Sequence, residues 1–439
     1  MNDLTAAAQK ACDAAIAAGA DFADVHAHCG TSLSVSIEDG AIKSSDAETG
    51  CGLSVRAFYR GGVGWYSSDA LDPDAAAEAG RAAGALARQA DPDPDFKSLP
   101  EPAEYAKVEG LYDEAVAGLS IGELIRHSLA NVEGALSAQP KAIVGGESSA
   151  GSAESALVNS LGVVISERGS YVSCYTSAAI RRGDDVGMFY DFDFARRLAD
   201  FDPQGLGARA AEEAAKFLGA RDIETKDLPV VFGPLASRGL LIPLVFSANA
   251  ESVQRKRSFM VGKLGEQVAS ALVTLIDDPL IPGGMSSGGH DGEGTARRRL
   301  TIIERGVLQT YLHDCYTAGK AGVQSTGHST RGGISPTNVN PQLGEKTAAE
   351  IIREVDEGLY FNAGGLSPNS TTGDVSSSID FAFKLERGEL AYPVKKGAMG
   401  GNLIELLKAV DAISSDCRAE PGSMMPTVRV TSARIAGGA

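Results

Sequence analysis

Side chains able to bind a transition metal are few in this chain of 439 residues. Six histidines are present: His26, His28, His127, His290, His313 and His328. None lies in an H-E-x-x-H or H-E-x-x-x-H pattern, so a helical pair of imidazoles with a glutamate base is absent. His26 and His28 would share one face of a strand, with Cys29 on the other, and His313 and Cys315 would share a strand face as well. We favour an exposed strand face for the first pair and a buried polar pair for the second over a metal site.

Two glycine-rich segments partly match motifs for a nucleophile or a phosphate. Residues 284–288 fit G-x-S-x-G, but a nucleophile elbow needs a strand before Ser286 and a helix after it. Prolines precede this segment and further glycines follow it, which favours a flexible loop. Residues 322–329 resemble a phosphate loop with His328 in the place of the lysine, and a largely neutral imidazole is a poor substitute for that fixed charge. We expect neither segment to be an active site.

The charge of the chain argues against nucleic acid as a partner. The formal net charge is −17 and the isoelectric point is near 4.9. An acidic surface repels phosphate backbones unless a dense basic stripe is present. The only dense basic clusters are residues 255–257 and 297–299. Direct binding of DNA or RNA is therefore not expected.

Nothing in the sequence indicates export or insertion into a membrane. The first residues lack a cationic start followed by an apolar run, and no stretch of about 18 apolar residues occurs. The cysteines show no C-x-x-C spacing, and we expect them to be reduced and mostly buried. They are Cys12, Cys29, Cys51, Cys174, Cys315 and Cys417. A cytoplasmic protein with no membrane association is expected.

Hydrophobic periodicity predicts helices and an antiparallel sheet in the N-terminal half. The Ala-rich segment 4–18 predicts a first helix that Gly19 ends. Alternating apolar residues around Asp39 and Gly40 predict a hairpin that continues into a meander of three or four strands. Further helices are expected at residues 73–90, 119–138 and 205–219, and strands at 141–192.

The C-terminal half is expected to contain mostly strands and Gly-rich loops. It follows a polar run at 221–227, which is typical of a domain boundary. A strand at 228–232 and one helix at 235–253 come first, and a further helix at 347–357 interrupts the later strands.

These elements predict an α+β fold in two domains. Residues 1–222 should place helices on an antiparallel sheet, with a proline-rich extended linker at about 91–105. Residues 223–439 should form a mostly β domain, arranged as a barrel or a sandwich.

Several segments along the chain form a recognisable series. The N-terminal part contains AAGADFADVHAHCG and LSVRAFYRGGVGW. The C-terminal half contains, in order, RKRSFMVGKLGEQVAS, TLIDDPLIPGG, ERGELAYPVKKGAMGGNL and the ending MPTVRVTSARIAGG. In their number, order and spacing these segments resemble the TldD/PmbA family (peptidase U62, modulator of DNA gyrase family) over nearly the whole chain.

The resemblance points to one of two branches of that family. In the TldD branch, a helix before the RK segment carries H-E-x-x-x-H, and a late cysteine completes a metal site. Here the two histidine positions fall on Ile242 and Ser247, and the glutamate position falls on Pro243. These side chains offer neither a metal site nor a proton shuttle. The segment Leu240–Phe246 is expected to be a buried apolar helix, and RKRSF, GKLGEQ and DDP resemble the PmbA/TldE branch.

What the resemblance implies is a non-catalytic PmbA/TldE-type subunit of a metallopeptidase. Such a chain pairs with a TldD-type subunit, and the pair acts on unfolded or small peptides held in an interior channel. The chain would hold no metal or cofactor and be inactive alone, with zinc only in the TldD-type partner. Arg255, Lys256, Arg257 and Arg331 lie in family-like segments, where they would anchor a peptide carboxylate or the partner. The alternative for these four residues is solvated surface or structural pairing.

Two other interpretations stay open at this point. The chain is a stand-alone peptide-binding or scaffold protein that forms a homodimer when isolated, or it is an independent hydrolase. The hydrolase would use the loop of Ser286 or the pair His313 and Cys315.

Overall fold

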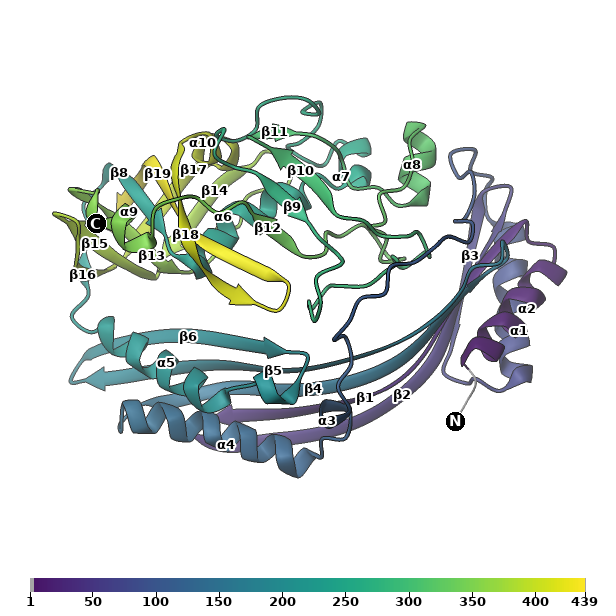
Figure 1. Cartoon of the computed structure of the whole chain (residues 1–439), viewed down its shortest axis with the longest axis horizontal. Coiled ribbons are helices and arrows are strands. Elements are labelled where there is room, and N and C mark those ends of the chain that lie inside the picture. Colours follow the sequence, from purple (N-terminus) through teal and green to yellow (C-terminus); the bar gives the residue numbers. More distant parts are fainter. Residues whose placement is uncertain (1–3, 439) are drawn as a thin grey trace.

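The computed structural model describes residues 4–438 and confirms the α+β class. Helices lie on an antiparallel sheet in the N-terminal part, and a curled sheet forms a half-barrel in the C-terminal part. Figure 1 shows the C-terminal part lying over the concave side of the N-terminal sheet, opposite its helices. No helix within residues 4–438 is both long enough and apolar enough to cross a membrane.

The N-terminal sheet has six antiparallel strands in the order β3-β2-β1-β4-β5-β6. They are β1 (Phe22–Glu38), β2 (Ala41–Tyr59), β3 (Gly62–Ser68), β4 (Ile143–Asn159), β5 (Val164–Arg182) and β6 (Asp185–Ala195). The predicted hairpin is confirmed, because Asp39 and Gly40 join β1 to β2 with φ angles of 50° and 74°. Positive φ at both turn residues is the geometry that a two-residue hairpin favours.

Helices cover the convex face of this sheet. They are α1 (Leu4–Ala17), α2 (Pro73–Gln89), α3 (Glu114–Ala117), α4 (Ile121–Ala138) and α5 (Pro203–Lys216). A short 3-10 helix, η1 (Leu198–Asp200), lies between β6 and α5. The four helices predicted for this part are confirmed. Val25 and Val35 of β1 pack beneath them. Because successive side chains of a strand point to opposite faces, the even-numbered residues between these two face the concave side.

The segment between α2 and α3 has no regular secondary structure. It includes the predicted linker, and it packs against the sheet instead of extending into solvent. Phe96 stacks on Phe58 with ring centroids 4.1 Å apart, and Leu99 is buried. The side-chain amide of Asn159 donates a hydrogen bond to the carbonyl of Pro100 at 2.8 Å. This segment is therefore a packed strap.

Two sheets make up the C-terminal part. The larger has the order β14-β17-β19-β8-β13-β15-β16-β7, with β18 paired to β19, and the smaller has the order β11-β10-β9-β12. Their strands are β7 (Arg221–Asp222), β8 (Lys226–Phe232), β9 (Leu275–Asp277), β10 (Leu300–Glu304), β11 (Val307–Leu308), β12 (Val339–Pro341), β13 (Glu357–Ala363), β14 (Asp374–Ile379), β15 (Phe381–Glu386), β16 (Glu389–Lys395), β17 (Gly397–Asn402), β18 (Val410–Glu420) and β19 (Ser423–Gly437). The predicted mostly β architecture is confirmed, and the division at residues 222 and 223 stays a prediction.

The helices of this part are α6 (Pro234–Phe246), α7 (Ala250–Gln254), α8 (Cys315–Ala321), α9 (Ala348–Arg353) and α10 (Leu403–Lys408). The prediction of a single helix at 235–253 is wrong, because the first helix ends at Phe246 and a second one begins at Ala250. Asn249 starts α7 as its N-cap, and its side chain accepts a hydrogen bond from the Ser252 N–H at 3.2 Å. Apolar periodicity continues through the break, so it does not reveal the new cap.

The strand face predicted for His313 and Cys315 is also wrong. Asp314, which lies between them, is the N-cap of α8 and accepts a hydrogen bond from the Thr317 N–H at 2.8 Å. Cys315 therefore begins a helix, and strand alternation does not apply to this pair.

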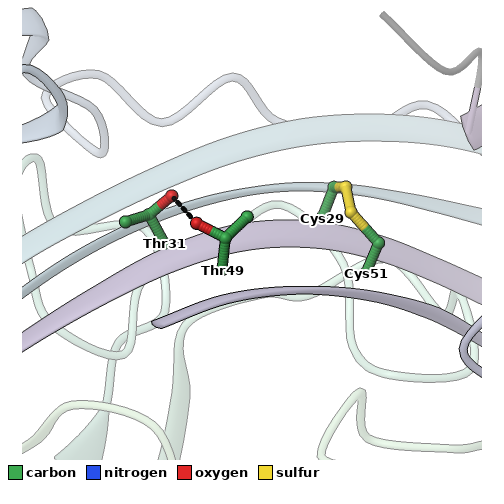
Figure 2. The surroundings of a disulfide bond; sticks show 4 residues. All are labelled: Cys29, Thr31, Thr49 and Cys51. Atoms are coloured by element: carbon green, nitrogen blue, oxygen red, sulfur yellow. Dashed lines mark hydrogen bonds between the residues drawn. A yellow bond between two sulfur atoms is a disulfide. The ribbon is translucent and has the colours of Figure 1, made fainter. Parts of the chain in front are cut away.

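One pair of cysteines contradicts the prediction that all six are reduced. Cys29 of β1 and Cys51 of β2 form a disulfide, and Thr31 and Thr49 form the hydrogen-bonded pair beside it (Figure 2). The two cysteines are directly opposite each other in the strand register, with Cα atoms 4.1 Å apart. Register is set by the fold and cannot be read from cysteine spacing, so this bond could not be predicted from the sequence.

Reduction of this disulfide is expected to lower the free energy of unfolding by about 3 kcal/mol, because the cross-link restricts the unfolded chain. The two cysteines are 22 residues apart in the sequence. Urea unfolding followed by circular dichroism, with and without a phosphine reductant, measures the change. Cys417→Ser, which removes a free thiol, is the control and should respond to the reductant as the wild type does. An identical urea midpoint in both conditions would contradict the expectation.

Candidate functional site

A cleft separates the concave side of the N-terminal sheet from α6. Two adjoining hollows of about 460 and 310 Å³ form it, and Phe194, Arg238 and Ile242 contribute to the walls of both. We call these two hollows the α6 cleft. Helix α6 supplies one wall, and β6 supplies the wall opposite.

Two of the three positions matched to the metal motif lie on the cleft side of α6. Ile242 and Pro243 line the cleft, and Ser247 follows as the C-cap of the helix. The other side of the helix, which includes Leu244, packs in the C-terminal core. The prediction of a buried apolar helix is therefore confirmed for one side and wrong for the other, where Phe246 is 51% exposed.

Pro243 leaves a backbone acceptor of α6 without its usual partner. Proline has no N–H, so Pro243 cannot donate to the carbonyl of Gly239 one turn earlier. Both residues line the cleft. Position 239 needs glycine, because a Cβ there would lie 2.8 Å from the backbone nitrogen of Leu366. The Gly239 carbonyl thus lacks the donor four residues later that a regular helix supplies.

Aromatic side chains form the wall opposite α6. Tyr190, Phe192 and Phe194 are alternate residues of β6, and all three line the cleft. The rings of Phe192 and Phe194 have centroids 5.4 Å apart. Arg418 of β18 stacks over Phe192 at 4.9 Å and pairs with Asp191 at 2.6 Å, which ties β18 to β6. This wall suits apolar side chains of a ligand.

Ser286 lines the smaller hollow but lacks the surroundings of a nucleophile. Residues 284–288 form a loop with a turn at Met285 and Ser286, and not a strand-to-helix elbow. The charged groups nearby are Arg238 and Glu420, which pair with each other at 2.9 Å. Within residues 4–438, no imidazole or carboxylate is hydrogen-bonded to the Ser286 hydroxyl, so no general base activates it.

Arg255, Lys256 and Arg257 form an exposed basic turn directly after α7. Arg255 pairs with Glu251 at 2.9 Å, and Lys256 has a left-handed φ of 57°. None of these three side chains lines the α6 cleft among the described residues. Their role as anchors for a peptide or a partner stays a prediction.

Arg331 lies apart from that basic turn, in a buried ion network. Its guanidinium donates hydrogen bonds to Asp24 at 2.6 Å and to the hydroxyl of Ser54 at 2.7 Å. Arg56 donates to Asp24 at 2.5 Å and to Glu293 at 3.1 Å. The Arg331 side chain is only 7% exposed, and both of its terminal nitrogens already donate to protein oxygens. This geometry supports the structural alternative for Arg331.

The buried network joins the two parts of the molecule. Asp24 and Arg56 come from β1 and β2, whereas Glu293 and Arg331 come from C-terminal loops. Burial by itself would raise the pKa of Asp24, but the two arginines hold that pKa below its usual range. Trp65 of β3 stacks on the network, with the Arg331 guanidinium 5.4 Å from its ring. Four paired charges thus fasten the end of the sheet to the C-terminal part.

A histidine cluster forms a second contact between the two parts. His26 and His28 stack on β1 with ring centroids 5.9 Å apart, as expected for residues on one strand face. The predicted exposure is confirmed for His28 and wrong for His26, which is half-buried. His290, from a C-terminal loop, is hydrogen-bonded through Nε2 to Glu167 of β5 at 3.1 Å. Burial lowers the pKa of His26 to about 4, so this imidazole is neutral at pH 7. Across residues 4–438, no group of three or more His, Cys, Asp and Glu side chains is arranged to hold a metal ion.

The pair of His290 and Glu167 makes stability depend on pH. Burial lowers the pKa of His290, but the hydrogen bond and charge of Glu167 outweigh it, so the net pKa is raised. The same hydrogen bond lowers the pKa of Glu167. The contribution of the pair is complete between the unfolded-state values of about 4.3 for Glu and 6.5 for His. It is lost as pH rises through the raised pKa of His290 or falls through the lowered pKa of Glu167.

We therefore expect Glu167→Gln to destabilise the chain more near pH 5.5 than near pH 8.5. The difference should stay below about 1 kcal/mol, because Glu167 is half exposed and water screens the pair. Urea unfolding at both pH values measures it. Glu154→Gln, at an exposed position of β4, is the matched control without a pH-dependent effect. Equal destabilisation by Glu167→Gln at both pH values would contradict the expectation.

The remaining motif residues have structural partners. His328 is buried and hydrogen-bonded to Asp277 at 3.0 Å, and Gly322 ends α8 with a left-handed φ of 69°. His313 Nδ1 is 3.2 Å from the Thr317 hydroxyl. Burial raises the pKa of the Cys315 thiol, which disfavours the nucleophilic thiolate. These contacts support neither a phosphate loop nor a site built on His313 and Cys315.

Sequence reasoning missed the aromatic wall and the buried network. The wall has a signal, because the segment MFYDFDFA places an aromatic residue at every second position from Tyr190 to Phe194, the period of a strand. The network has no local signal, since Asp24 and Arg331 are 307 positions apart.

Three family models match successive parts of the chain. The model for PmbA/TldA metallopeptidase domain 1 matches residues 23–87, and the model for the central domain matches residues 114–218. The model for the PmbA/TldA metallopeptidase C-terminal domain matches residues 225–437. Together these matches cover most of the described chain.

Individual relatives agree with these matches. The metalloprotease PmbA of Escherichia coli O157:H7 is 27% identical over 424 residues, which covers 95% of this chain and 92% of that protein. The solved structure of TldE from Thermococcus kodakarensis has a TM-score of 0.90 at 25% identity, and the match covers 98% of this chain and all of that one. A putative modulator of DNA gyrase from Bacteroides thetaiotaomicron has a TM-score of 0.88 at 27% identity, with 98% of each chain covered.

Proposed function

Because this chain belongs to the PmbA/TldD metallopeptidase family, we propose that it is the non-catalytic, PmbA/TldE-type subunit of a heteromeric metallopeptidase. The pair would degrade or process unfolded and small peptides. One observation supports the proposal: at the positions of the H-E-x-x-x-H motif the chain has Ile242 and Pro243, which line the α6 cleft, and Ser247, the C-cap of the helix.

The residues at these positions do not fit zinc. Structural and catalytic zinc sites use imidazole, thiolate and carboxylate ligands. Ile242 and Pro243 have no side-chain donor atom, and Ser247 has only a neutral hydroxyl. We therefore assign zinc to a TldD-type partner and derive no step of hydrolysis through this chain.

The contribution of this chain is to hold the peptide. An extended peptide brings backbone N–H groups that need acceptors, and the Gly239 carbonyl is one such acceptor in the cleft. Phe192 and Phe194 offer flat apolar surfaces to its side chains. Binding of this kind orients a peptide without acting on its bonds, so the catalytic groups have to come from the partner.

The proposal is tested by the cleavage of an unfolded protein such as casein. The purified chain, a TldD-type partner and a mixture of the two are compared. We expect the chain to cleave nothing alone and the mixture to cleave casein. Cleavage by this chain alone would contradict the proposal.

A further inference from the structure

The concave face of the N-terminal sheet is open over the middle of its strands. Along β5, Tyr171 and Tyr175 are 37% and 45% exposed, whereas Val172 and Cys174 are buried beneath the helices of the convex face. We call the strip that crosses the strands from Asp46 and Glu48 on β2 to Phe192 on β6 the concave strip.

One end of the concave strip is aromatic and apolar. Tyr175 lies directly opposite Phe192 in the pairing of β5 with β6, and its ring centroid is 6.0 Å from that of Tyr190. Met188, which faces the same side of β6, is 52% exposed. Exposed aromatic residues in a row are costly to leave in water and typical of a surface that binds a ligand.

The other end of the concave strip is acidic. Asp46 and Glu48 of β2 lie at this end, and Glu147 of β4 lies nearer the aromatic end, directly opposite Tyr175 of β5; all three are exposed and face the concave side. Glu147 accepts a hydrogen bond from the Ser149 hydroxyl at 3.1 Å, and none of the three carboxylates forms an ion pair among the described residues. Lys43, the lysine of the same strand, is already paired with Glu38 at 2.7 Å.

Small residues connect the two ends. Glu48, Ser32, Gly151 and Tyr171 follow one another across β2, β1, β4 and β5. A hollow of about 440 Å³ lies over this row, and the Tyr171 ring lies across Gly151, where a Cβ would be 2.7 Å from it. Arg196 is the guanidinium at the rim of this hollow, and it donates to the carbonyls of Ser170 and Met285, both at 2.7 Å. Both terminal nitrogens of Arg196 therefore already donate to backbone carbonyls of the protein.

We propose that the concave strip is a binding site for extended cationic peptide segments. The proposal rests on the function proposed above and deepens it by naming the class of peptide. Glu48 and Tyr171 are three strand spacings apart, which is about 14 Å, or about four residues of an extended chain. The strip therefore selects a lysine or arginine about four positions from an aromatic or large apolar residue.

Charge decides between the possible occupants of the strip. Three unpaired carboxylates attract a cationic peptide and repel an anionic one. A second copy of this chain, with a net charge of −17, would bring further negative charge to the same place. A cationic segment is the occupant that this face complements.

The binding of two labelled peptides to the full chain tests the proposal. Both are Gly/Ser peptides that contain a phenylalanine. One carries lysines about four positions from the phenylalanine, and the other carries glutamates at the same positions. Fluorescence anisotropy at low salt should show that the lysine peptide binds at least about tenfold more tightly, and added salt should reduce this preference. Tyr175→Ser should weaken the binding of both peptides.

The triple variant Asp46→Asn, Glu48→Gln, Glu147→Gln should reduce the preference to within about twofold. The matched control neutralises three exposed acids of the convex side, Glu78→Gln, Glu133→Gln and Glu154→Gln, and should keep the preference. Thermal unfolding shows that both triple variants are folded. Equal binding of the two peptides to the wild type, a preference for glutamate, or a preference that survives in the concave triple variant would overturn the proposal.

Failure of this proposal is distinguishable from failure of the proposed function. Partner-dependent cleavage of casein reports the subunit role whatever the peptide preference is. A mixture that cleaves casein, together with a chain that binds neither labelled peptide or does not distinguish them, overturns only the assignment of the concave strip. Light scattering that shows a homodimer whose formation blocks the lysine peptide would assign the strip to a second copy and overturn it as well.

Discussion

Replacement of Asp24 by alanine is expected to lower the free energy of unfolding by about 3–5 kcal/mol, among the largest effects of any single substitution in this chain. Asp24 is fully buried and accepts hydrogen bonds from both Arg56 and Arg331. Without it, two guanidinium groups stay buried with only Glu293 as a counter-charge. Urea unfolding followed by circular dichroism measures the loss.

Two further variants separate the network from a general effect of substitution. Asp13→Ala removes an exposed aspartate of α1 and should change the free energy of unfolding by less than about 0.5 kcal/mol. Combining Asp24→Ala with Arg331→Met removes one of the stranded charges and should recover part of the loss. A loss of unfolding free energy below about 1 kcal/mol for Asp24→Ala would contradict the expectation that the buried charges of the network depend on Asp24.

Ile242→Arg is expected to reduce partner-dependent cleavage of peptides by at least about tenfold, which corresponds to about 1.4 kcal/mol of binding free energy. Ile242 contributes to the walls of both hollows of the α6 cleft. An arginine there fills the apolar space between α6 and Phe194 and adds a charge to it. Cleavage of casein by a mixture of the variant and a TldD-type partner measures the loss.

The matched control is Leu272→Arg, which places the same side chain at a 51% exposed position outside the cleft. It should leave cleavage within about twofold of the wild type, since isolated surface substitutions are well tolerated. Thermal unfolding of both variants shows whether the fold is retained. Full activity of a folded Ile242→Arg variant would mean that peptides do not pass through the α6 cleft.

Elements with strong local signals were predictable from the sequence. The hairpin at Asp39 and Gly40 requires two residues that accept positive φ, and this dipeptide supplies them. The start of α4 is marked by Ser120 and Glu123, which form a capping box. In each case the chemistry that fixes the element lies within a few residues, so one sequence is enough.

Features that depend on register or on distant segments were not predictable. The bond between Cys29 and Cys51 follows from the pairing of β1 with β2, which cysteine spacing does not specify. The break between α6 and α7 is hidden because apolar residues continue through it. Arg331 sits in a family-like segment, but only the fold brings it to Asp24.

The candidate site was predictable only in part. Ile242, Pro243 and Ser247 could be placed because the motif segments of the family fix their position in the sequence. The side of α6 that Ile242 and Pro243 occupy could not be predicted, since α6 is apolar around most of its circumference and periodicity does not show which side is open. The aromatic wall of β6 becomes part of the site only when the two parts of the molecule come together.

The measurement that tests the central claim is the zinc content and casein cleavage of the purified chain, alone and with a TldD-type partner. We predict no stoichiometric zinc and no cleavage for the chain alone, and cleavage when the partner is added. That activity should vanish when the glutamate of the partner's H-E-x-x-x-H motif is replaced by glutamine. Near-stoichiometric zinc and chelator-sensitive cleavage by this chain alone would contradict the account.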